Sequence, residues 1–187
     1  NGWLRSSRER HHHDPAEHWA FVPGELRERL EKIRRKARRR LGDICEVSVG
    51  VQTSKDDVFL FDEVQSAPGK LLHARTARGR VVELESALVR RCVKGAAREE
   101  RWLLFPYDRN GRLLTAEELK ASFPKAWAYL SRHRKALEAR EKGAFKGPCW
   151  YAFGRSQGFR ECSLPKILIP ATMNETRYVD DEAGELA

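Results

Sequence analysis

The sequence has few cysteines and no long apolar run, and both shortages exclude classes of protein. Its four cysteines, Cys45, Cys92, Cys149 and Cys162, form no Cys-x-x-Cys pair, which is the spacing that zinc ribbons and dithiol redox sites need. We therefore expect reduced and mostly buried thiols. No segment approaches the roughly 18 apolar residues of a membrane span, and no signal-peptide pattern opens the chain. The sequence thus predicts a cytoplasmic protein with no membrane partner.

The motifs that carry catalysis are also missing. The chain has no Gly-rich phosphate loop, no Gly-x-Ser-x-Gly elbow and no His-Glu-x-x-His pair. His11, His12 and His13 stand beside Asp14, but three consecutive side chains point in different directions, so they predict no metal site. We expect a chain that binds rather than one that catalyses.

Positive charge is what the sequence has in excess. Its 187 residues carry 36 Lys and Arg against 27 Asp and Glu, which gives a formal net charge of +9, and the isoelectric point is near 9.6. Such a balance favours a polyanionic partner, although ribosomal, membrane-surface and merely well-solvated proteins share it. With 41% hydrophobic residues, the chain can bury one principal core.

Apolar periodicity predicts a basic amphipathic helix over 25–40, after an extended arm in residues 1–24. Arginine fills the other faces of this helix and could neutralise several DNA phosphates. Intrahelical pairing of Glu with Arg on a solvated surface is the equally weighted alternative. The candidate phosphate contacts are Arg34, Arg35, Arg38 and Arg39, with Arg27 and Arg40 on the same helix.

Local patterns beyond residue 41 predict an α+β domain. Two strands, 44–51 and 58–61, are expected around the loop QTSKDD, followed by an irregular segment over 66–80 in which 70–73 could form a strand. Thr115 and Glu118 form a capping-box signature for a helix over 115–121, and Pro124 opens a second helix to about residue 141. Further strands are expected at 81–84, 88–93 (or a helical turn), 102–107, 150–153, 166–170 and 177–179. The prediction is a twisted, mostly antiparallel sheet packed against the helices of 115–141, with the basic N-terminal helix as a connector.

The first candidate recognition segment is the polar loop after the glycine-containing run EVSVGV. Thr53, Ser54 and Lys55, followed by Asp56 and Asp57, offer the hydroxyl, ammonium and carboxylate groups that contact phosphates and base edges. An ordinary surface hairpin is the alternative.

The second candidate segment is PCWYAFGRSQ, in which two aromatic residues precede Gly154, Arg155, Ser156 and Gln157. Arg pairs bidentately with guanine and Gln with adenine, so this loop could read the major groove. In the alternative, Trp150 and Tyr151 belong to the core and Arg155 forms an ordinary ion pair.

Five segments in order resemble the TaqI-like C-terminal specificity domain, the target recognition domain of adenine-N6 DNA methyltransferases and of single-chain restriction-modification enzymes. These segments are LGDICEVSVGVQTSKDDVFLF, ELESALVRRCVKG, WLLFPYDRNGRLLTAEELKASFPKAWAYLSRHRKALEARE, WYAFGRSQ and PKILIPATMNETRYVDDEAG. They span residues 41 to 184, and the phrase from FPYD through YLSRHRKALEAR is the most specific.

The resemblance implies a division of labour. A catalytic methyltransferase domain of the same parent chain would bind S-adenosylmethionine and methylate a flipped adenine, while this domain reads double-stranded DNA in a bacterial cytoplasm, with or without an endonuclease in the parent. The family's catalytic motif, Asn or Asp before Pro-Pro-Tyr or Pro-Pro-Phe, is absent. Phe105, Pro106 and Tyr107 are expected to be structural, so this fragment should hold no cofactor and catalyse nothing.

The resemblance also suggests boundaries and leaves rivals open. We expect an arm and connector helix at 1–40 and the target recognition domain at 41–187, as a fragment truncated at both ends. One rival is a protein-interaction module of a phage-defence complex that docks through 124–141 and Trp127. Another is an RNA-binding domain in which Trp150 and Tyr151 stack on unpaired bases.

Overall fold

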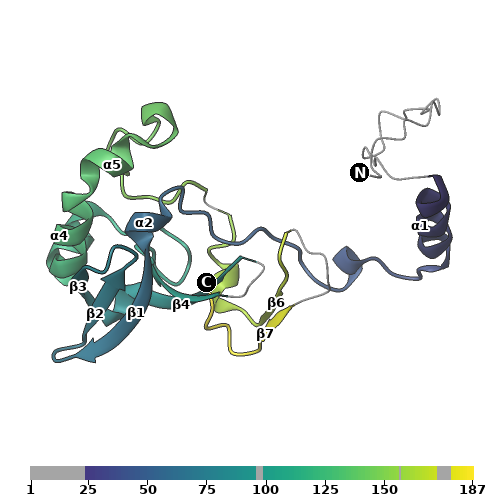
Figure 1. Ribbon diagram of the computed structural model, residues 1–187, viewed down its shortest axis with the longest axis horizontal. Coiled ribbons are helices and arrows are strands. Elements are labelled where there is room, and N and C mark those ends of the chain that lie inside the picture. Colours follow the sequence, from purple (N-terminus) through teal and green to yellow (C-terminus); the bar gives the residue numbers. More distant parts are fainter. Residues whose placement is uncertain (1–23, 96–98, 156, 172–177) are drawn as a thin grey trace. The chain divides into compact units, whose positions relative to one another are not determined.

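The computed structural model describes residues 24–95, 99–155, 157–171 and 178–187, and its contacts divide the chain into the units Asn1–Val47 and Ser48–Ala187. The first unit holds helix α1 (Gly24–Lys36) and the short 3-10 helix η1 (Leu41–Asp43) (Figure 1). Glu25 in the first turn of α1 and Arg34, Arg35 and Lys36 in the last suit the helix dipole. The second unit holds the sheets and the remaining helices. The start of the recognition domain at residue 41 stays a prediction.

The main sheet has five strands among the described residues, and every neighbouring pair is antiparallel. Its order is β3-β2-β1-β5-β4. The pairing of β1 with β5 is short, joining Leu60 to Leu103 and Phe61 to Trp102, and the register of β1 with β2 shifts after Phe61. A second antiparallel sheet pairs β6 with β7. The strands are β1 (Leu60–Ala67), β2 (Leu71–Thr76), β3 (Val81–Glu85), β4 (Val89–Lys94), β5 (Glu99–Leu104), β6 (Lys166–Leu168) and β7 (Val179–Asp181).

Specific polar contacts fix the helices that follow the sheet. Thr115 and Glu118 form the capping box at the start of α3, because each side chain accepts a hydrogen bond from the other's backbone N–H. The carboxylate of Glu85, at the end of β3, accepts bonds from the backbone N–H groups of Lys125 (2.8 Å) and Ala126 (2.9 Å), which anchors α4 to the edge of the sheet. The helices are α2 (Asp56–Phe59), α3 (Ala116–Ser122), α4 (Pro124–Arg132) and α5 (Arg134–Glu138), with the 3-10 turns η2 (Ser86–Leu88), η3 (Arg140–Gly143) and η4 (Glu161–Ser163).

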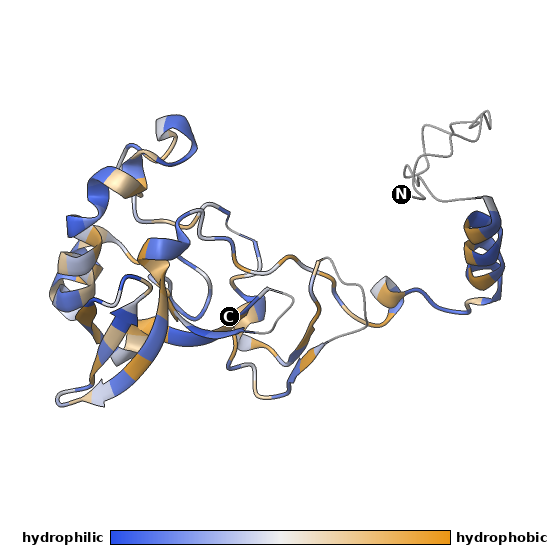
Figure 2. Cartoon of the chain, in the orientation of Figure 1, coloured by the Kyte–Doolittle hydropathy of each residue, from blue (hydrophilic) through white to orange (hydrophobic). Residues whose placement is uncertain are grey.

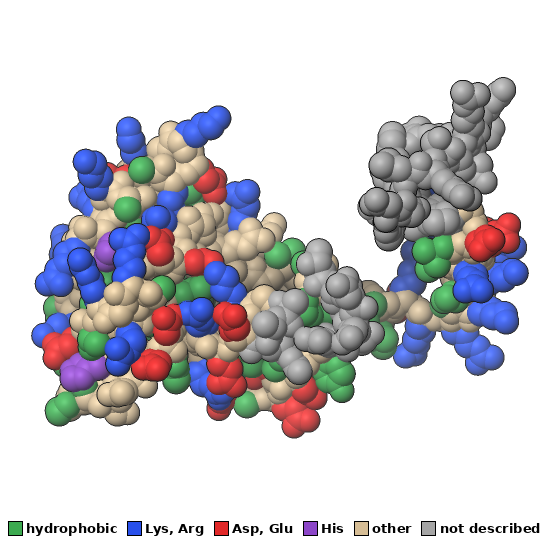
Figure 3. Space-filling view, in the orientation of Figure 1, with side chains coloured by type: hydrophobic (Ala, Val, Ile, Leu, Met, Phe, Trp, Pro, Cys, Tyr) green, Lys and Arg blue, Asp and Glu red, His purple; other side chains and the backbone are tan. Residues whose placement is uncertain are grey.

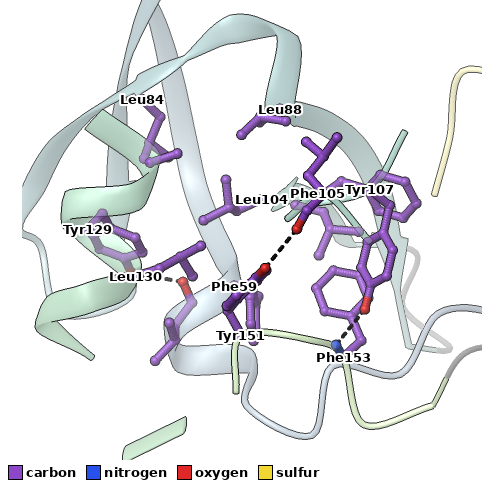
Figure 4. Packing of buried hydrophobic residues seen from close by; sticks show 14 of the residues in the cluster. Phe59, Leu84, Leu88, Leu104, Phe105, Tyr107, Tyr129, Leu130, Tyr151 and Phe153 are labelled. Atoms are coloured by element: carbon purple, nitrogen blue, oxygen red, sulfur yellow. Dashed lines mark hydrogen bonds between the residues drawn. The ribbon is translucent and has the colours of Figure 1, made fainter. Parts of the chain in front are cut away.

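The core lies between the sheet and the helices and continues into an aromatic cluster from the loops (Figure 4). The ring of Phe153 lies 4.9 to 5.8 Å from those of Phe59, Phe105 and Tyr107, and the rings of Phe105 and Tyr107 lie 5.1 Å apart. The Tyr107 hydroxyl accepts a bond of 2.7 Å from the backbone N–H of Phe153, and burial raises the pKa of Tyr107 to about 12. The segment around Phe153 is thus tied to the core through main chain and side chain.

The architecture confirms the expected α+β class and the antiparallel sheet packed against helices. The strand predictions at 81–84, 88–93 and 102–107 correspond to β3, β4 and β5, with the last ending earlier, at Leu104. The helix over 115–121 corresponds to α3. The helix expected over 124–141 is divided at His133, whose φ of −98° and ψ of 3° interrupt α4 before α5 begins.

Three local predictions were wrong. Residues 44–51 form no strand, since among the described residues no strand pairs with them, and Ile44, Val47 and Val49 are exposed; β-branched side chains favour a strand only where a partner accepts its hydrogen bonds. Val58 and Phe59 belong to helix α2 instead of a strand. Residues 150–153 form a buried turn.

The segment 66–80 was expected to be irregular, with a possible strand at 70–73. Much of it instead belongs to the hairpin of β1 and β2, which was not predicted. The turn between these strands contains Gly69 with φ of +72°, so its Pro-Gly-Lys composition marked a tight turn rather than a long loop. The thiol prediction was half right: Cys92 and Cys162 are buried, whereas Cys45 and Cys149 are exposed.

Candidate nucleic-acid interface

The two candidate recognition segments lie side by side. The backbone N–H of Gly154 donates to the carbonyl of Thr53 and that of Arg155 to the carbonyl of Gln52, both at 3.2 Å, which makes an isolated antiparallel bridge between Gln52 and Arg155. Segments far apart in the sequence therefore form one surface, defined here as the paired loops, residues 51–57 and 152–158.

Two glycines allow the paired loops to approach this closely. A Cβ atom at Gly154 would overlap the hydroxyl group of Ser54, and one at Gly158 would overlap the carbonyl oxygen of Val49. Gly158 also has φ of +75°, a conformation that L side chains rarely adopt. The prediction of a glycine-supported loop rested on Gly154 alone, and Gly158 was missed.

Thr53 shapes its loop from the inside. Its side chain is 5% exposed, and its hydroxyl donates to Asp56 Oδ1 at 2.5 Å while accepting from the backbone N–H of Lys55 at 3.1 Å. Burial alone would raise the pKa of Asp56, but hydrogen bonds from Lys94 and Thr53 outweigh it and hold that pKa below its ordinary value. In this arrangement Thr53 positions the loop, and the neighbouring residues present side chains to solvent.

A buried arginine joins the loops to the end of the helical segment. Arg140 is 6% exposed and donates 2.8 Å hydrogen bonds to four backbone carbonyls, those of Leu137, Thr53, Trp150 and Ala152. Burial lowers its pKa, but the group stays charged because the ordinary value for Arg is so high. Arg140 was not predicted, since its only sequence signal was its place at the end of an amphipathic helix.

The residue after Arg140 brings a carboxylate between the paired loops. Glu141 has φ of 46° and Lys142 φ of 60°, followed by Gly143 at 88°, so the chain makes a left-handed turn there. Glu141 Oε1 accepts a 3.1 Å hydrogen bond from Ser54 Oγ and lies 3.6 Å from Nη1 of Arg155. One oxygen therefore contacts a polar side chain from each loop.

The remaining predicted residues of the paired loops face outward. Arg155 has a side chain 57% exposed despite its ion pair with Glu141, and Gln157 is exposed. Lys55 is half-buried and lies 3.1 Å from Asp57. Residues 51–57 line an open depression of about 560 Å³. Ser156 lies outside the described residues.

The arginines predicted on the N-terminal helix divide between two conformations. Arg34 and Arg35 lie in α1, whereas Arg38 and Arg39 follow its end at Lys36, so the helix is shorter than predicted. All four side chains are exposed, and Arg35 lies 3.9 Å from Glu31. Figure 2 shows apolar residues among the polar ones on α1. Helical charge pairing and phosphate binding both fit these positions.

The aromatic residues that the two rival functions need are largely buried. Trp150 and Tyr151 are 3% and 2% exposed, so they cannot stack on unpaired bases, which corrects the basis of the RNA-binding alternative. Trp127 is partly buried and packs 5.6 Å from Trp150 and 5.7 Å from Tyr151. Phe105 and Tyr107 are core residues, as expected.

The described residues form no Rossmann-like cofactor site. Nucleotide-type cofactors of Rossmann-like domains bind at the carboxyl ends of parallel strands, where a Gly-rich turn opens a helix, whereas both described sheets are antiparallel. No group of three His, Cys, Asp or Glu among these residues could hold a metal ion, and His11, His12 and His13 lie outside them. No helix in the described part is long and apolar enough to cross a membrane.

Comparison with known proteins gives an informative similarity. No protein-family profile matches the chain. Its sequence is 23% identical over 169 residues to a protein named type II methyltransferase M.BanIII, from Aneurinibacillus aneurinilyticus. The aligned region covers 90% of this chain but 28% of that methyltransferase, so the chain spans less than a third of the length of its relative.

Proposed function

We propose that this chain is the sequence-reading domain of an adenine-specific DNA methyltransferase in a restriction-modification system, and that it binds double-stranded DNA. The observation that carries the proposal is the hydrogen-bonded pairing of the two loops, which presents Lys55, Arg155 and Gln157 from distant parts of the sequence on one surface. The similarity to a type II methyltransferase over 90% of the chain supports the same conclusion.

The side chains on the paired loops suit the grooves of duplex DNA. The guanidinium of Arg155 can donate two hydrogen bonds to guanine, and the amide of Gln157 can pair with adenine. Lys55 suits either a phosphate or a guanine edge. These contacts would select the sequence, while Thr53, Gly154 and Arg140 hold the loops in place.

Methylation itself would take place in another domain of the parent protein. That domain would bind S-adenosylmethionine and a flipped adenine, and this chain would hold the duplex from the opposite side during extrusion of the base. No catalytic residue is proposed in this chain, and no step of the methyl transfer is assigned to its side chains.

The first experiment is a binding comparison with the 187-residue chain. We expect it to prefer duplex DNA over single-stranded DNA and RNA, with an affinity that falls steeply as salt rises from about 50 mM to about 200 mM. Equal or tighter binding to single strands would contradict duplex recognition.

A second experiment tests the parent protein. Single-molecule sequencing of genomic DNA, with and without the full-length gene, should show N6-methyladenine lost from one defined motif when the gene is deleted. Identical methylation maps with the protein expressed would overturn the methyltransferase assignment, and a search for protein partners through the helices of 124–141 would follow.

A further inference from the structure

Beside the paired loops, a group of cations lies close enough to one histidine to affect its pKa. Arg78 and Arg80 come from the turn between β2 and β3, Arg132 from the end of α4, and Lys55 from the first paired loop. Asp57 connects two of them, since it lies 3.1 Å from Lys55 and 3.9 Å from Arg78. This set, centred on His133, is called the His133 cluster.

The His133 cluster has more positive than negative charge. Many basic side chains of this unit are paired, such as Arg75 with Glu63 and Lys125 with Glu83. Within the described residues, by contrast, Asp57 is the one carboxylate paired with a cation of the cluster, and no carboxylate pairs with Arg80 or Arg132. Like charges held together destabilise a folded chain, so a surface needed for solubility alone would mix the two signs.

The turn that carries two of these arginines is well defined. Thr76 accepts hydrogen bonds from the backbone N–H of Gly79 (2.8 Å) through its carbonyl and from that of Arg80 (3.2 Å) through its hydroxyl, and its own N–H donates to the carbonyl of Arg80 (2.8 Å). Gly79 has φ of +76°, which closes the turn. Because this backbone is fixed, the Arg78 side chain, 83% exposed, reaches solvent from a defined position.

The charges of the cluster also act on the titration of His133. Its ring lies 4.8 Å from that of Tyr129. Burial lowers the pKa of His133; Asp57 raises it, and the positive charges of Arg132, Arg78 and Arg80 lower it. Arginines from two separate elements thus act on a single imidazole. Figure 3 shows Lys and Arg side chains gathered over the region that Figure 1 labels α4 and α5.

We propose that the His133 cluster binds the backbone phosphates of duplex DNA next to the bases that the paired loops read. This inference rests on the proposed function and assigns the phosphate contacts to the second unit, in addition to the arginines of α1. Lys55 belongs to both surfaces, because it lies in a paired loop and pairs with Asp57. A duplex seated on the loops would therefore extend its phosphates over the arginines of the cluster.

The test compares two triple variants of the 187-residue chain, each of which removes three positive charges. The cluster variant carries Arg78→Ala, Arg80→Ala and Arg132→Ala. The control carries Lys70→Asn, Arg109→Ala and Lys120→Ala, whose positions are also exposed and do not contribute to the pKa of His133. Lys70 is replaced by Asn rather than Ala because φ at this position is 60°, a conformation that Asn tolerates. Thermal unfolding checks that both variants fold. If the cluster variant does not fold, the single variant Arg132→Ala takes its place.

Binding of a short duplex of arbitrary sequence is measured by fluorescence anisotropy over a range of salt. Each lost phosphate contact reduces the magnitude of the slope of log affinity against log salt by about 0.9. We therefore expect the slope of the cluster variant to be smaller in magnitude by about 2 to 3. Its affinity at about 0.1 M salt should fall by at least on the order of 10-fold, and the control should change much less. In the wild-type chain, NMR titration should show the pKa of His133 rising when duplex binds, because nearby phosphates favour the imidazolium.

The outcomes separate this inference from the proposed function. Steep, salt-dependent binding by the wild type with an unchanged slope in the cluster variant would overturn the inference and leave DNA recognition standing. An equal loss in the control would also overturn it, since net charge alone would then explain the effect. Absence of duplex binding by the wild type at low salt would overturn both.

Discussion

Replacement of Arg140 by Met should destabilise the second unit by about 3 to 5 kcal/mol, because the removal of one buried charged group leaves its partners unsatisfied. Met fills a similar volume but donates nothing to the carbonyls of Leu137, Thr53, Trp150 and Ala152. A buried acceptor without a donor costs about 1 to 3 kcal/mol. The total cost is less than four times the cost of one unsatisfied acceptor. The carbonyl of Thr53 still accepts the hydrogen bond from Gly154, and water can reach loops near the surface.

Urea unfolding followed by tryptophan fluorescence, with Trp150 buried in the core, measures the effect. With a slope of about 2 kcal/mol per molar urea, a loss of about 4 kcal/mol moves the midpoint down by about 2 M. The matched control is Arg134→Met, at a residue whose side chain is 57% exposed and paired with Glu138; it should cost no more than about 1 kcal/mol. A midpoint for Arg140→Met indistinguishable from that of the control would refute the role given to Arg140.

Three further predictions follow from the paired loops and the capping box. In the full-length parent, Arg155→Ala should relax or abolish the choice of methylated sequence, which methylation mapping measures. Arg38→Ala should weaken the binding of all duplexes about equally, which a duplex-binding assay measures. Equal loss across sequences for Arg155→Ala would remove its assignment. Glu141→Gln should tighten binding to arbitrary duplexes by about 2- to 5-fold at low salt, because it removes a carboxylate beside Arg155; weaker binding would show instead that Glu141 is needed to position that arginine. Hydrogen bonds from Arg112 and the backbone of Thr115 lower the pKa of Glu118 from 4.5 to about 2, so its stabilising effect is full above about pH 4.5 and is lost as the pH falls toward 2. The difference in melting temperature between wild type and Glu118→Gln should therefore shrink over that interval, and a difference independent of pH would exclude this linkage.

Local signals predicted the parts of the fold whose causes are local. The capping box of Thr115 and Glu118 and the apolar strand before Pro106 depend on residues a few positions apart, and both were identified. The extended run through Val47 and Val49 has the same β-branched composition, yet it forms no strand in the described structure, because the formation of a strand depends on a partner that composition does not reveal.

The outward-facing side chains of the candidate site were predicted from the sequence, but Arg140 and Glu141, which contact the loops, were not. Arg155 and Gln157 were predicted because their chemistry suits base edges; both are exposed, and their role in DNA binding stays a prediction. Arg140, in contrast, acts through carbonyls contributed by three separate stretches of chain, and no spacing in the sequence encodes that convergence. Its neighbour Glu141 faces the loops because of a left-handed turn, and Gly143 is the residue whose type indicates such a turn.

The paired loops are held together mainly through backbone atoms. Their bridge joins backbone N–H groups to carbonyls, and Arg140 also donates hydrogen bonds to backbone carbonyl oxygens rather than to side chains. The identities of Lys55, Arg155 and Gln157 are therefore largely independent of the frame that displays them. Under the proposed function, evolution or an engineer could exchange these three residues to select another DNA sequence, while Thr53, Gly154 and Arg140 keep the loops in place.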